Sequence, residues 1–140
     1  MTKRGFDLPP KASPDVIAQR HELADAVCRE LLRAGLPAYR GDADGGPYTG
    51  PGAEAHLDPL VGGAVFVDWN SSGELTRAAI DLFEKGIDPS DPPAVFRHYG
   101  TVHQNMRDAL LAILRSAGFE AEEADPHTHG GAIRVSGFRH

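Results

Sequence analysis

Two segments of the chain repeat one order of helix, turn and strand, and this repeat constrains the fold more than any other feature. The segments "DPLVGGAVFV" at 58–67 and "DPHTHGGAIRV" at 125–135 share Asp-Pro, a short spacer, Gly-Gly-Ala and an apolar-x-Val strand. A helical pattern that ends at a glycine precedes each of them, in "AGLPA" at 34–38 and "AGFEA" at 117–121. The chain therefore reads as two helix-strand-strand units, consistent with an internal duplication. The alternative is that such glycines and turns recur because few residue types form them.

Apolar residues at helical spacing predict two long helices. The first is expected over residues 14–34, because Pro14 suits the first helical position and the apolar stripe continues until a glycine. The second is expected from about 95 to 117, with Gly100 as a point where it could break.

A shorter helix is expected over 72–85, where Ser71 and Glu74 form a capping-box pattern and Phe83 belongs to the apolar stripe. Strand patterns lie near 36–40, 64–69, 119–124 and 132–136. Pro37 weakens the first of these and favours an edge position. These elements predict a two-layer α+β fold, with about four mainly antiparallel strands and the helices on one face.

A glycine-rich segment lengthens the first unit. From the helix-ending glycine to the Asp-Pro turn the first unit spans 23 positions and the second spans 7, so the first holds a 16-residue insertion. Residues 41–63 contain seven Gly and three Pro, which is typical of a loop. We therefore predict a loop insertion at 41–57, a flexible N-terminal arm at 1–12 and a single α+β domain at 13–140.

The turn of the second unit carries a candidate metal site. Asp125, His127 and His129 stand at alternate positions, so an extended chain would place one carboxylate and two imidazoles on one face. The first unit has the Asp-Pro and Gly-Gly of this segment but neither histidine. The comparison favours a hairpin turn with variable residues at its tip, and a divalent metal site is the alternative.

Three further residues are candidates for a binding site. Asp68 and Trp69 stand at the end of the central strand, and His103 borders the apolar stripe of the last helix. Trp69 could line a pocket, and core packing is its alternative role.

Charge and composition limit the classes of partner. The chain has a net charge of −6 at pH 7 and an isoelectric point near 5.6, which gives no overall attraction to nucleic acid or to anionic lipid. No apolar run reaches the roughly 18 residues of a membrane span, and the N-terminus lacks the apolar run of a secretory signal. We expect a cytoplasmic protein that binds neither nucleic acid nor membrane.

Two classes of function remain. The favoured hypothesis is a non-catalytic binding or protein-interaction domain without a cofactor, whose partner is another protein or a second copy in a homodimer. A weakly protected edge strand could pair with another chain. The alternative is a small metal-dependent enzyme centred on His127 and His129, with the glycine-rich loop as a lid.

Overall fold

The computed structural model describes residues 10–41, 51–60, 62–86, 88, 90–125 and 131–138. Within these residues the chain forms the helices α1 (Pro14–Arg33), α2 (Gly73–Glu84) and α3 (Ala94–Ser116). All three lie where the sequence predicts them, and α3 continues through Gly100 without a break.

The N-terminus of α2 differs from the predicted capping box. Ser72 is the N-cap residue, and its side-chain oxygen accepts a hydrogen bond from the Leu75 N–H at 3.3 Å. Ser71 is buried instead, with its hydroxyl 3.0 Å from the hydroxyl of Thr76. Adjacent serines can each supply the capping oxygen, so the sequence did not distinguish them.

The strands form one mixed sheet. They are β1 (Ala38–Arg40), β2 (Gly52–Leu57), β3 (Val65–Asn70), β4 (Phe119–Glu123) and β5 (Ile133–Phe138). Their order across the sheet is β1-β2-β3-β5-β4, with β1 parallel to β2 and the other neighbours antiparallel. The predicted sheet of about four mainly antiparallel strands is thus corrected to five described strands in a mixed sheet.

Strand β2 lies inside the segment 41–57 that the sequence assigns to a loop, and this part of the loop prediction is wrong. Ala53 and Ala55 are both 1% exposed and face the helices, while Glu54 between them faces the other way. Gly52 permits the strand to start beside β1, because its φ is +134° and a Cβ there would lie 2.8 Å from the Pro37 carbonyl oxygen. Small residues at alternate positions make a strand that hydrophobicity alone does not reveal.

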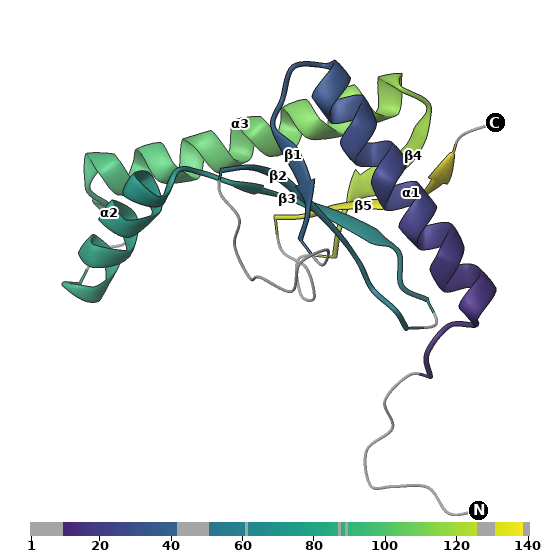
Figure 1. Ribbon diagram of the computed structural model, residues 1–140. Helices are drawn as coiled ribbons and strands as arrows, with labels where there is room; N and C mark the ends of the chain where they lie inside the picture. The colour runs from purple at the N-terminus through teal and green to yellow at the C-terminus, as the bar shows by residue number, and fades with distance from the viewer. Residues whose placement is uncertain are drawn as a thin grey trace, which may run out of the picture.

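The core lies between one face of the sheet and the helices α1 and α3. Both helices contact several strands and each other, and Figure 1 shows them on the same side of the sheet. The largest fully buried side chains are Phe119, Leu31, Leu110, Leu114, Ile133, Val27, Val65, Val67 and Val135. Four-residue spacing on the helices and two-residue spacing on the strands aim these side chains at one layer.

The two helix-strand-strand units match only roughly. Strands β3 and β5, which follow the two Gly-Gly-Ala segments, are antiparallel neighbours with Phe66 opposite Arg134. In the second unit β4 pairs directly with β5, whereas in the first unit β2 lies between β1 and β3. The inserted segment therefore supplies a strand that separates the hairpin partners of the first unit.

Helix α2 and the first half of α3 project beyond the sheet. In Figure 1 α3 extends past the sheet at the end where α2 packs against it. Among the described residues α2 makes its main contacts with α3 and has one buried residue, Ala79. No helix in the described part of the chain is long and apolar enough to cross a membrane.

Candidate functional site

The three predicted binding residues lie on β3 and α3, and two of them interact electrostatically. Trp69 faces the helices and packs against the core, which is the structural role that the sequence left open. Burial lowers the pKa of the His103 imidazole, and the negative charge of Asp68 opposes this shift. The Tyr99 ring lies 4.3 Å from the His103 ring, centroid to centroid. Trp69 thus belongs to the core, and the Asp68 charge raises the pKa of His103 without reversing the effect of burial.

A polar cluster that the sequence did not predict occupies the sheet face away from the helices. The Asn70 amide nitrogen donates to the Tyr39 hydroxyl at 2.7 Å and to a Glu54 carboxylate oxygen at 2.8 Å. Glu54 stands directly opposite Asp68 across β2 and β3. The cluster was missed because Glu54 was assigned to a loop, although the alternation in "GAEAHL" is a strand signal.

A second row of side chains crosses the same face. Pairing places His56 opposite Phe66, Phe66 opposite Arg134 and Arg134 opposite Glu122. The His56 and Phe66 rings stack with centroids 6.1 Å apart, and Arg134 and Glu122 form an ion pair at 3.7 Å. Phe66 is 4% exposed, so this row has a buried aromatic centre, with the ion pair on one side and His56 on the other.

The predicted metal ligands cannot be assembled from the described residues. Asp125 is exposed, and His127 and His129 lie outside the residues that the structure describes. Among the described residues, no three His, Cys, Asp or Glu side chains are grouped so that they could hold a metal ion. The metal site at Asp125, His127 and His129 stays a prediction, which the metal content of the purified protein tests.

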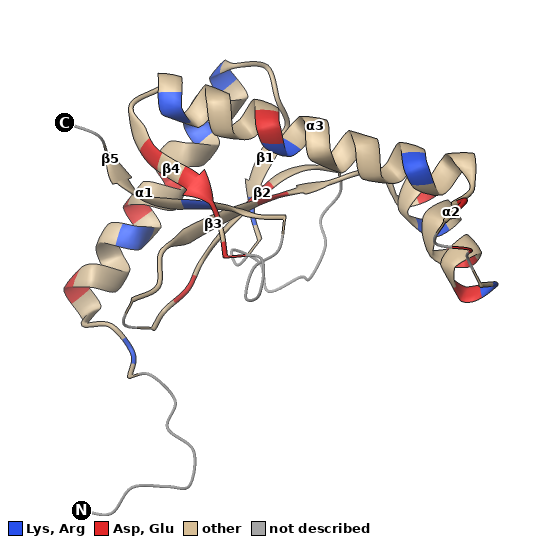
Figure 2. Cartoon of the chain, turned by 180° about the vertical axis from the view of Figure 1, so that it is seen from behind, with Lys and Arg blue, Asp and Glu red and all other residues tan. Residues whose placement is uncertain are grey.

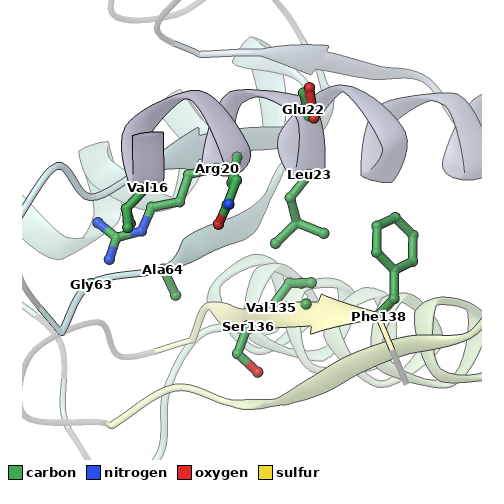
Figure 3. Close-up of a pocket in the computed structure, with 11 residues that line it drawn as sticks. Val16, Arg20, Glu22, Leu23, Gly63, Ala64, Val135, Ser136 and Phe138 are labelled. Carbon is green, nitrogen blue, oxygen red and sulfur yellow. The ribbon is translucent and has the colours of Figure 1, made fainter. Parts of the chain in front are cut away.

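A cleft of about 410 Å³ opens between α1 and the end of β5. Figure 3 shows Leu23 directed from α1 toward Val135, with Arg20 and Phe138 at opposite ends. The Arg20 guanidinium donates to the backbone carbonyls of Asp58 and Leu60 at 2.6 and 2.8 Å. These bonds tie α1 to the turn before β3, so Arg20 has a structural role. The cleft offers mainly apolar contacts and indicates no particular ligand.

Helix α2 carries the most exposed apolar surface of the described elements. The large apolar side chains with high exposure are Leu32, Ile80, Phe83 and Phe138, and two of them are on α2. Figure 2 shows that basic and acidic positions also lie on this helix. We name as the α2 outer face the side of the helix that carries Gly73, Thr76, Arg77, Ile80, Phe83 and Glu84.

The α2 outer face combines a groove with a projecting ring. Gly73, Thr76, Arg77 and Ile80 line a shallow groove of about 340 Å³. Phe83 is one turn further along, is 67% exposed and stacks on Phe96 of α3 with ring centroids 6.4 Å apart. The sequence placed Phe83 in the apolar stripe of this helix, and the structure leaves most of the ring exposed. The missed signal was the spacing of residues 73, 76, 80 and 83, which places two small and two large apolar side chains along one stripe of the helix.

Comparisons with known proteins do not place the chain in a family. No protein-family model, curated protein or solved structure matches it. The functional conclusion therefore rests on the residues of the chain itself.

Proposed function

We propose that this protein is a non-catalytic domain that binds another protein, with the α2 outer face as its contact surface. The observation that carries the proposal is the exposure of two neighbouring large apolar side chains. Ile80 is 51% exposed and Phe83 is 67% exposed, on a helix that packs on α3 and projects beyond the sheet.

Burial energetics explain why such a face suits binding. Covering a side chain of this size stabilises a complex by about 1.5–3 kcal/mol. The exposed parts of Ile80 and Phe83 contribute little of this to folding of the single chain, so the gain is available to a partner. Arg77 and Glu84 on the same face would supply the charged rim that surrounds the apolar centre of most interfaces.

The edges of the sheet are weaker candidates for the same role. The outer strands are β1 and β4. Strand β1 has only three residues, and β4 carries Glu120, Glu122 and Glu123. Short edge strands and charged side chains both disfavour pairing with another chain. These obstacles act on strand pairing and do not apply to the face of a helix.

Photo-crosslinking in the cells that make the protein tests the proposal. A photoreactive phenylalanine analogue at position 80 should form a covalent adduct with a protein. The same analogue at Ala112, an exposed position in the second half of α3, should form none. Phe83→Asp in the same chain should abolish the adduct at position 80 with only a small fall in melting temperature, because Phe83 is mostly exposed and loses only its contact with Phe96.

Absence of any adduct at position 80 would contradict the proposal. So would an adduct that persists in the Phe83→Asp chain, because the contact would then not depend on the apolar face. A large fall in melting temperature for Phe83→Asp would show instead that the ring belongs to the packed contact between α2 and α3.

A further inference from the structure

We infer that the partner of the α2 outer face is a second copy of this chain, bound with the two α2 helices antiparallel about a two-fold axis at Ile80. This identification of the partner rests on the proposed function. The identification adds a specific geometry to the proposed function. Three features of α2 support this geometry: the spacing of the residues along its seam, the position of its groove and the order of its charges.

The first feature is the spacing of a seam of small and apolar residues along α2. Gly73, Thr76, Ile80 and Phe83 follow one another at intervals of three, four and three residues. Alternating intervals of three and four keep side chains on one narrow stripe, which is the pattern of helices that pair side by side. The seam lies beside the face that packs on α3, where Ala79 is buried, and Phe83 at its end also stacks on Phe96 of α3.

The second feature is that the groove and the exposed ring are placed symmetrically about Ile80. When helices pair in this way, a side chain from one helix fits a hole formed by four residues of the other. The residues around the groove have the spacing of such a hole: Gly73, Thr76, Arg77 and Ile80. The centre of the groove precedes Ile80 by three to four residues, and Phe83 follows it by three.

An antiparallel second copy therefore brings each Phe83 ring to the groove of the other copy. A two-fold axis makes the two contacts identical, so each copy both inserts its Phe83 ring and receives the ring of the other copy in its groove. Stacking on Phe96 holds the ring before the copies meet, which reduces the conformational entropy that association would cost.

The third feature is the order of the charges that flank the seam. Arg77 precedes Ile80 by three residues and Glu84 follows it by four. In the antiparallel pair each Arg77 faces the Glu84 of the second copy, and the reverse contact forms by symmetry. Within one chain these two residues are seven positions apart, about two helical turns, so they are not neighbours. The charge order is thus complementary between copies.

Sedimentation velocity of the purified full-length chain over a wide range of concentrations tests the inference. The unmodified chain should show a reversible monomer-dimer equilibrium. Ile80→Asp should weaken the dimer by about tenfold or more, because it places a charge at the centre of the interface. Circular dichroism and the melting temperature of each variant should show that the fold is retained.

Charge exchange provides the decisive comparison. Arg77→Glu alone and Glu84→Arg alone should each weaken the dimer, because each opposes like charges between copies. The chain with both substitutions should recover most of the lost affinity. Lys85→Glu makes the same change in charge as Arg77→Glu but lies about 140° around the helix from Ile80, so it should leave the dimer unchanged.

A dimer that is insensitive to Ile80→Asp, or a double exchange that fails to recover affinity, would overturn the inferred geometry. A chain that stays monomeric at every concentration would overturn the second copy as partner. In that case adducts at position 80 with other proteins would leave the proposed function standing, whereas the absence of all adducts would remove both.

Discussion

The protonation of His103 depends on where the folded chain places its imidazole. The sequence places it at the border of an apolar stripe, where it could pack or bind. In the folded chain its Nε2 atom is buried and has no hydrogen-bond partner among the described residues. Burial lowers the pKa of the imidazole, and the Asp68 carboxylate only partly offsets this. A neutral imidazole packed beside Tyr99 is the result.

This lowered pKa predicts a pH dependence of stability. The pKa of a histidine in the unfolded chain is about 6.5, so below that pH the unfolded state binds more protons at this position than the folded state does. The free energy of unfolding should therefore fall as the pH falls below about 6.5, and above that pH His103 should contribute no pH dependence. Urea denaturation of the unmodified chain and of His103→Gln, at pH values on both sides of 6.5, should show a smaller fall in the variant.

Asp68→Asn provides the control for this prediction. Removing the carboxylate charge should lower the pKa of His103 further, as measured by NMR titration, because that charge now favours the protonated ring. Equal pH dependence in the unmodified chain and His103→Gln would show that burial does not lower the pKa of His103. A pKa that rises in Asp68→Asn would contradict the effect assigned to the Asp68 charge.

For some large apolar residues the sequence does not predict whether the side chain is buried. Both Trp69 and Phe83 are large apolar residues in amphipathic elements, yet Trp69 packs against the core and Phe83 is 67% exposed. Periodicity shows that side chains share a face but not which face meets the rest of the protein. On α2 the apolar residues cover more than one side of the helix, and the position of α3 determines which side is buried.

Helices were the elements that the sequence predicted best. The observed α1 begins at the predicted residue and ends one residue early, and α2 is one residue shorter than predicted at each end. Caps, prolines and helix-ending glycines are local signals, so helix ends need no knowledge of distant contacts. Strand β2 is the opposite case, because its place depends on pairing with β1 and β3, which are distant in sequence or separated by turns.

The role of β2 in the core predicts a contrast between adjacent positions. Ala55→Gln should lower the free energy of unfolding by about 2–5 kcal/mol, because a larger polar side chain would be buried against α1. His56→Gln should cost about 1 kcal/mol or less, since residue 56 lies on the other face and is partly exposed. Urea denaturation measures both values. Similar small costs at the two positions would indicate that residues 52–57 are a loop after all.

The whole molecule has a sheet covered by two helices and an arm formed by α2 and the first half of α3 (Figure 1). The sequence predicted the two-layer α+β arrangement, because amphipathic helices and strands with one apolar face must bury those faces against each other. It did not predict the order β1-β2-β3-β5-β4 or the arm. Both depend on which elements meet across long stretches of chain, and local patterns contain little information about this.

The central claim is that two copies of the protein meet at the α2 outer face rather than at an edge of the sheet. Hydrogen-deuterium exchange of the full chain, compared between dilute and concentrated solution, tests it most directly because it reports on every described element at once. We expect slower exchange in the concentrated sample for amides of α2, within residues 73–84, with the sheet unchanged. Slower exchange at β1 or β4 with α2 unchanged would place the contact at a sheet edge and contradict the claim.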